Sequence, residues 1–206
     1  MSSSVPLEIT AIAFDLGNVL IKVDHLRFCR RLARIANRTP AEVYADVFAT
    51  GLEPGYDTGR LSSWEFYQRV LNHFQIDLPY PQFSAWWNDI FDPMEEMEEI
   101  VRHLQGRFPL YLMSNTNALH FPSICRRFPL VYCCRRFILS YQVGSRKPEA
   151  AIYQALIKEM GQPPEKCLFI DDKSTFVEAA KTHGLVAWQF TSPQEFIDNL
   201  KGHGLY

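Results

Sequence analysis

Five short apolar runs recur along the chain, and most of them are continuous rather than alternating in polarity. Continuous apolar segments of this length are typical of strands that are buried on both faces of a parallel sheet. The pattern therefore predicts five buried strands, at ITAIAF (9–14), LYLM (110–113), FILS (137–140), CLFI (167–170) and VAWQF (186–190).

Helical patterns lie between and after most of these runs. Strands that alternate with helices in this way form a parallel sheet with helices packed on it, so the sequence predicts a doubly wound α/β fold. Pro148 is expected in the first turn of its helix, where a proline costs no hydrogen bond. The predicted helices are 94–105, 117–127, 148–160, 174–183 and 193–200.

The interval 22–92 breaks the alternation, because it contains no convincing strand. Turn-rich joints at 52–62 and 76–81 separate its helical patterns. A direct crossover between two parallel strands needs far fewer residues, so we expect an inserted α-helical domain at 22–92 and a core domain formed by 1–21 and 93–206. The predicted helices of the insert are 25–36, 40–49, 62–74 and 81–91.

The composition is that of a globular chain, because 206 residues with 47% hydrophobic content can bury a full core. A net charge of −2 gives no general attraction to nucleic acid or to an anionic membrane. The start of the chain lacks the regions of a signal peptide, and no apolar run approaches the roughly 18 residues of a membrane span. We expect a cytoplasmic monomer or homodimer without nucleic-acid or membrane partners, whose five cysteines are structural thiols.

Carboxylates stand at two of the predicted strand ends. Asp15 follows the first strand, and Asp171 and Asp172 follow the fourth. In an open parallel sheet the carboxyl ends of the strands share one edge, where ligands bind. Three carboxylates at one place repel each other unless a hard cation lies between them, and oxygen ligands favour Mg²⁺.

Hydrogen-bond donors stand at the other strand ends. Ser114 and Asn115 follow the second strand, and Lys147 precedes the third helix of the core. A hydroxyl, a backbone N–H at a strand-to-helix turn and an ammonium suit the oxygens of a phosphate. Asp15 is then the best placed nucleophile. Each motif alone is typical of a helix cap or a turn, but four of them at successive strand ends indicate a site.

The four motifs FDLGNVL, LYLMSNTN, SRKPEAAIY and LFIDD resemble, in order and spacing, those of the haloacid dehalogenase-like hydrolase superfamily. The resemblance covers roughly residues 8–200 and is greatest to the branch of glucose-1-phosphate phosphatases. It implies a Rossmann-like core, and the helical insert resembles the family's C1-type cap, which closes over the substrate.

The resemblance also implies a mechanism, in which Asp15 attacks the phosphoryl group and water hydrolyses the resulting aspartyl-phosphate. Mg²⁺ would be held by Asp15, the backbone carbonyl of Gly17 and Asp172, with Asp171 as a direct or water-mediated ligand. Ser114 and Asn115 would hold the phosphate, and Lys147 would balance the charge of the crowded carboxylates and the transferring group.

Gly17 departs from the family pattern, because most phosphatases of the superfamily have a second aspartate there as the general acid and base. Such a group typically contributes about 10²–10⁴-fold to the rate. Three accounts stay open: a substrate with a good leaving group, a substitute acid such as Asp24 or His25, or a catalytically weak ligand-binding protein. The family's dehalogenases also lack this aspartate, but they do not combine that loss with an acidic pair such as Asp171 and Asp172.

Substrate choice in this family depends on the cap. The segment GYDTGRLS (55–62) is expected to face the site, with Tyr56, Asp57 and Arg60 as candidate specificity residues. For His120 two interpretations are open, a place near the mouth of the cleft or, as we expect, a surface position on a helix. The sequence therefore predicts an Mg²⁺-dependent phosphatase that acts on a small phosphorylated metabolite such as a sugar phosphate.

Overall fold

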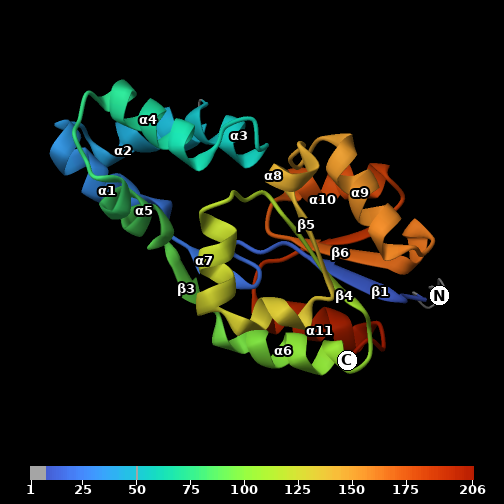
Figure 1. Ribbon diagram of the computed structural model, residues 1–206. Helices are drawn as coiled ribbons and strands as arrows, with labels where there is room; N and C mark the ends of the chain where they lie inside the picture. Colours follow the sequence, from blue (N-terminus) through green and yellow to red (C-terminus); the bar gives the residue numbers. More distant parts are fainter. Residues whose placement is uncertain (1–7, 50) are drawn as a thin grey trace.

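The computed structural model describes residues 8–49 and 51–206. Its core is a five-stranded, entirely parallel sheet with the order β5-β4-β1-β6-β7 (Figure 1). The chain starts in the centre and winds outward in both directions, so the predicted doubly wound sheet is confirmed. The strands are β1 (Ala11–Phe14), β4 (Leu110–Ser114), β5 (Arg136–Leu139), β6 (Cys167–Asp171) and β7 (Val186–Gln189).

Helices cover both faces of the sheet, and the alternation of side chains along each strand separates the two layers. Ile12 and Phe14 of β1 pack in one apolar cluster with α6 and α11, whereas Ala11 and Ala13 pack in the other with α9 and α10. The helices of the core are α6 (Glu95–Gln105), α7 (His120–Arg127), α8 (Ser140–Val143), α9 (Ala150–Met160), α10 (Ser174–Thr182) and α11 (Pro193–Gly202), with 3₁₀ turns at Pro129–Cys133 and Pro164–Lys166.

A helical insert, which we define as α1 to α5, lies beyond one end of the sheet (Figure 1). Aromatic side chains fill its interior, where Phe28 and Phe66 pack against Trp87 with ring centroids 4.9 and 4.8 Å apart. Capping boxes begin two of its helices, at Thr39 and Ser62. Its helices are α1 (His25–Ala36), α2 (Pro40–Tyr44) with a π-helical continuation at Ala45–Ala49, α3 (Leu52–Asp57), α4 (Ser63–Phe74) and α5 (Tyr80–Asn88).

Three local expectations were wrong. The interval without predicted strands begins and ends in an antiparallel ribbon of β2 (Ile21–Val23) and β3 (Phe91–Pro93), which are too short to produce a recognisable pattern. The joint at 52–62, which was expected to consist of turns, contains α3. Pro148 lies outside α9, because Glu149 has an extended backbone and the helix begins at Ala150.

Two expectations from composition can be compared with the structure. All five cysteines are free thiols, and four of them are buried. Within residues 8–49 and 51–206, no helix combines the length and apolar character that crossing a bilayer requires.

Candidate active site

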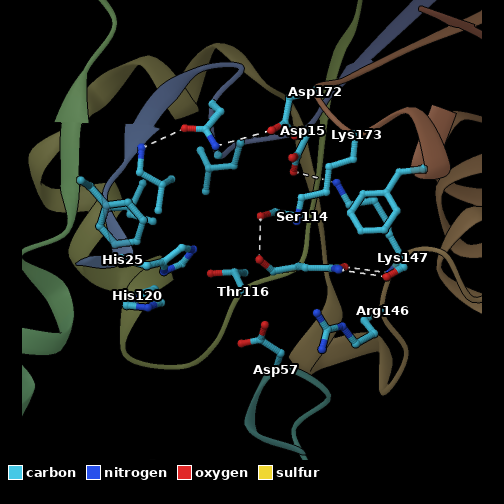
Figure 2. Close-up of a pocket in the computed structure, with 18 of the residues that line it drawn as sticks. Asp15, His25, Asp57, Ser114, Thr116, His120, Arg146, Lys147, Asp172 and Lys173 are labelled. Carbon is cyan, nitrogen blue, oxygen red and sulfur yellow. Dashed lines mark hydrogen bonds and ion pairs between the residues drawn. The ribbon is translucent and has the colours of Figure 1, made fainter. Parts of the chain in front are cut away.

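The carboxyl ends of β1, β4 and β6 meet at one cavity of about 130 Å³ (Figure 2). Asp15 follows β1, Ser114 ends β4, and Asp172 follows the last residue of β6. Chain reversals after each strand therefore bring together side chains that are about 100 and 157 residues from Asp15 in the sequence. The predicted residues that line the cavity are Asp15, Gly17, His25, Asp57, Ser114, Asn115, Lys147 and Asp172.

Lys147 connects the acidic groups of the site. Its Nζ atom lies 2.7 Å from Oδ1 of Asp15 and 2.5 Å from Oδ2 of Asp171, and only 1% of the residue is exposed. Burial lowers the pKa of the ammonium, but the two facing carboxylates raise it by more, so Lys147 is charged. Asn115 fixes the backbone here, since its amide accepts from the Lys147 N–H at 2.8 Å and donates to the Lys147 carbonyl at 3.1 Å.

Asp15 is a nearly enclosed carboxylate. Burial raises its pKa to about 7, with Lys147 opposing the rise and the charge of Asp171 adding to it. Ser114, 3% exposed, and Arg146 line the same cavity. The Asp15 carboxylate thus shares a cavity with a hydroxyl and two cationic side chains, an arrangement suited to a phosphoryl group.

The carboxylates of Asp15, Asp171 and Asp172 fit a divalent cation, because one oxygen from each lies within 4.8 Å of the others. Both oxygens of Asp171 already accept hydrogen bonds, one from Lys147 Nζ and one from the Lys173 N–H at 2.9 Å. Asp172 is only half-buried, and Asn18 is its hydrogen-bond partner at 3.5 Å. The arrangement favours Asp172 over Asp171 as a direct ligand.

The two candidate substitutes for the missing acid lie in different places. Asp24 does not line the cavity; its carboxylate pairs with Arg27 at 3.8 Å and Arg30 at 3.5 Å. His25 lines the cavity, but burial and the nearby charge of Lys173 lower its pKa to about 4. Its imidazole is therefore neutral near pH 7 and has no imidazolium proton to donate.

Of the three expected specificity residues, only Asp57 reaches the cavity. The Tyr56 ring stacks on Phe66 inside the insert with centroids 4.5 Å apart, and its hydroxyl lies 2.7 Å from that of Ser63. Arg60 is exposed and lies outside the cavity lining. The expectation that Tyr56 faces the site was wrong, because α3 replaces the predicted turn and the Tyr56 ring packs in the apolar core of the insert. Arg60 follows α3, and its role in specificity stays a prediction.

His120 was expected at the surface but is buried at 4% exposure. Its ring stacks on Trp87 at 4.7 Å, and its Nε2 atom has no hydrogen-bond partner among the residues that the structure describes. Sequence reasoning also missed Asn18 and Glu53, which line the cavity. Asn18 had a signal, because an asparagine next to a glycine favours the left-handed conformation that it adopts here, with φ 57°.

Comparison with known proteins identifies the family of the chain. The sequence model of haloacid dehalogenase-like hydrolases matches residues 9–184, which include every strand-end group described above. The chain belongs to this family. It is therefore a hydrolase, and the resemblance of its four motifs to those of the haloacid dehalogenase-like hydrolases is confirmed.

Two relatives within the family are phosphatases. The D-ribitol-5-phosphate phosphatase of Bacteroides thetaiotaomicron is 26% identical over 186 residues, which cover 86% of this chain and 90% of that protein. The sesquiterpene phosphatase of Aspergillus oryzae is 24% identical over 189 residues, with coverage of 88% and 89%. A family enzyme from B. thetaiotaomicron, solved with magnesium and inorganic phosphate, shares the fold at TM-score 0.81 and 24% identity, over 89% of this chain and 94% of that one.

Gly17 is the chain's departure from the common haloacid dehalogenase-like site. A Cβ atom added there would lie 3.0 Å from Cγ2 of Val23, which is closer than ordinary van der Waals contact. Val23 belongs to β2, which β3 holds in register. A side chain at position 17 therefore competes for space with the ribbon that leads into the insert.

Proposed function

We propose that the protein is an Mg²⁺-dependent phosphatase that hydrolyses a small phosphorylated metabolite of the sugar-phosphate or sugar-alcohol-phosphate class. The observation that carries the proposal is the convergence of Asp15, Lys147 and Asp172 on one cavity. The cavity volume of about 130 Å³ lies below the roughly 300 Å³ at which sites for drug-sized ligands begin, which supports a small substrate. The named activity of the B. thetaiotaomicron relative, on a sugar-alcohol phosphate, supports the same class.

In the proposed reaction, the Asp15 oxygen bonds to phosphorus as the ester P–O bond breaks and the alcohol leaves, which forms an aspartyl-phosphate. Water then attacks that phosphorus, the bond from phosphorus to the Asp15 oxygen breaks, and inorganic phosphate and the carboxylate result. Ser114, the Asn115 N–H and Lys147 hold the phosphoryl oxygens, and Lys147 keeps Asp15 oriented through their ion pair. Asp15, the Gly17 carbonyl and Asp172 would hold Mg²⁺, with Asp171 positioning Lys147. Bound Mg²⁺ supplies positive charge that offsets the carboxylates and the phosphate.

We also propose that 22–92 acts as a mobile cap over a core formed by 1–21 and 93–206. The proposal is supported by the two-strand ribbon that joins the parts and by the contribution of α1 and α3 to the cavity. Asp57 on α3 meets Asn117 of the core through a 3.0 Å hydrogen bond, so this contact accompanies closure.

A substrate panel with and without EDTA tests the proposed function. We expect Mg²⁺-dependent release of inorganic phosphate from sugar and sugar-alcohol phosphates, and loss of that release when EDTA removes the metal. Restoration by added Mg²⁺ is the control for irreversible damage. No release from any phosphomonoester of the panel would contradict the proposal.

Gly17 favours one second candidate, a haloacid dehalogenase-like protein that binds a phosphorylated ligand without turnover. Beryllium fluoride distinguishes the two, since a metal-dependent adduct on Asp15 requires an intact phosphoryl-transfer site. An adduct together with phosphate release supports the enzyme. Ligand binding without either result supports the binding protein.

Gly59 permits the close approach of the insert to the core. Its φ is +69°, and an added Cβ atom would lie 2.3 Å from the carbonyl oxygen of Tyr141 at α8. Gly59→Ala is expected to displace α3 and to lower kcat/KM roughly 10- to 100-fold, because small misplacements of an active-site group are costly. Gly144→Ala is the matched control: its φ is +76°, but its Cβ atom meets nothing within 4 Å. Equal losses of kcat/KM in Gly59→Ala and Gly144→Ala would show that backbone strain alone causes the effect.

A further inference from the structure

Asp57 places a buried carboxylate of the helical insert in the wall of the active-site cavity. The residue is the last of α3, lines the cavity and is 4% exposed. Its Oδ1 atom accepts a 3.0 Å hydrogen bond from Nδ2 of Asn117, and it has no ion pair within 4.0 Å among the described residues. A buried carboxylate that forms no ion pair requires another explanation.

The hydrogen bonds of Asn117 determine which oxygen of Asp57 can carry a proton. Oδ1 of Asn117 accepts from the N–H groups of Leu119 at 3.3 Å and His120 at 3.0 Å, and from the Trp87 indole at 3.5 Å. These donors fix the orientation of the amide, so its NH₂ group must face Asp57. Oδ1 of Asp57 is thus an acceptor, and a proton on this carboxyl group belongs on Oδ2.

Asp57 lies on the leaving-group side of the site. Figure 2 shows Asp15 and Asp57 at opposite ends of the pocket, with Ser114 and Thr116 between them. In phosphoryl transfer the attacking and leaving oxygens are roughly in line on opposite sides of phosphorus. With Asp15 as the attacking group and Ser114 at the phosphate, the leaving oxygen points toward Asp57.

We propose that Asp57 is the general acid and base of this enzyme. From the insert it carries out the proton transfers for which Gly17 has no side chain. The inference rests on the proposed phosphatase function. As the Asp15 oxygen bonds to phosphorus and the ester P–O bond breaks, the Oδ2 proton passes to the leaving oxygen and yields the alcohol. The Asp57 carboxylate then accepts a proton from the water that attacks the aspartyl-phosphate, which returns Asp15 as a carboxylate and Asp57 as an acid.

The charges around Asp57 keep both of its forms accessible. Burial raises its pKa to about 6, whereas the Asn117 hydrogen bond and the positive charges of Arg146 and Lys173 oppose the rise. Glu53 lies one turn earlier on α3 and lines the same cavity; burial and the charge of Asp57 raise its pKa as well. A group with a pKa near neutrality can both donate and accept a proton during one turnover.

Asp57→Asn tests the assignment, because asparagine keeps the Oδ1 acceptor for Asn117 but cannot act as an acid. The readout is the pre-steady-state rate of ester cleavage, with substrate in excess over enzyme, for two esters, an alkyl phosphate from the panel and p-nitrophenyl phosphate. The nitrophenolate leaves without protonation. We expect the alkyl ester to react about 10²–10⁴-fold more slowly, and p-nitrophenyl phosphate to give a burst of nitrophenolate at a rate within about tenfold of the parent, followed by slow turnover.

Two variants make the result specific. Asp77→Asn changes an exposed aspartate of the insert and is expected to leave both rates unchanged. Glu53→Gln tests the competing carboxylate. The assignment is overturned if Asp57→Asn slows the cleavage of both esters equally or slows neither. It is also overturned if the loss of rate that depends on the leaving group occurs in Glu53→Gln instead. Asp57→Ser is used in its place if thermal unfolding shows that Asp57→Asn does not fold. Failure of the parent on every ester contradicts the proposed function itself.

Discussion

Asp15→Asn is expected to abolish phosphate release, with a fall in kcat of roughly 10⁴-fold or more, as for other enzymes that lose their nucleophile. The amide has the shape of the carboxylate but cannot form the acyl-phosphate. Lys147 keeps its 2.5 Å contact with Asp171 in the variant, so folding is expected to be retained. The measurements are steady-state phosphate release and mass spectrometry of acid-quenched protein.

The mass spectrum carries the decisive control for this prediction. During turnover the parent is expected to show a phosphoryl adduct on the peptide that contains Asp15, and the variant none. Asp77→Asn should behave as the parent. Substantial activity in Asp15→Asn would show that another group attacks phosphorus, and the proposed mechanism would then be wrong.

Lys147→Met is expected to affect both stability and activity. The ammonium is shared by Asp15 and Asp171, and removing one partner of a buried ion pair typically costs about 3–5 kcal/mol because a buried charge is left uncompensated. Loss of a donor to the transferring group should also lower kcat by roughly 10²–10³-fold. Urea unfolding without metal measures the first effect, and phosphate release with Mg²⁺ measures the second.

Lys166→Met is the matched control for Lys147→Met. Its ammonium pairs with Glu8 at 2.9 Å, but this pair is exposed to solvent. Surface pairs contribute about 0–1 kcal/mol, so little change in the free energy of unfolding is expected. If the free energy of unfolding of Lys147→Met also falls by less than about 1 kcal/mol, water or structural relaxation must stabilise the carboxylates of Asp15 and Asp171. That result would contradict the burial described above.

The positions of Asp15, Ser114 and Asp172 were predictable because a parallel sheet gathers the carboxyl ends of its strands at one edge. The strands β1, β4 and β6 that carry these residues are buried along their whole length, so each apolar run ends visibly in the sequence. Short elements gave no such signal. The strand β2 has three residues, and it pairs with residues of β3 that are 68 to 72 positions away in the sequence. Periodicity cannot reveal elements of that length.

The insert's contribution to the site was harder to predict. Asp57 was recognised as a candidate, but its partner Asn117 lies 60 residues away, and only the folded chain places it against Asp57. His120 was misassigned because its local pattern indicates a surface helix, whereas stacking on Trp87 of the insert buries it. Contacts between segments that are far apart in the sequence leave no periodic pattern in either segment.

The depth of the cavity has a consequence for the order in which products leave. Lys147, which is 1% exposed, lines it together with Ser114, whereas Asp57 enters from the insert (Figure 2). In the proposed reaction the alcohol is released on the side of Asp57 and departs when the contact with Asn117 opens. Inorganic phosphate stays behind at Ser114 and Lys147 and leaves last. Accumulated phosphate would then occupy the same enzyme form as the substrate, so the end product itself would restrain turnover.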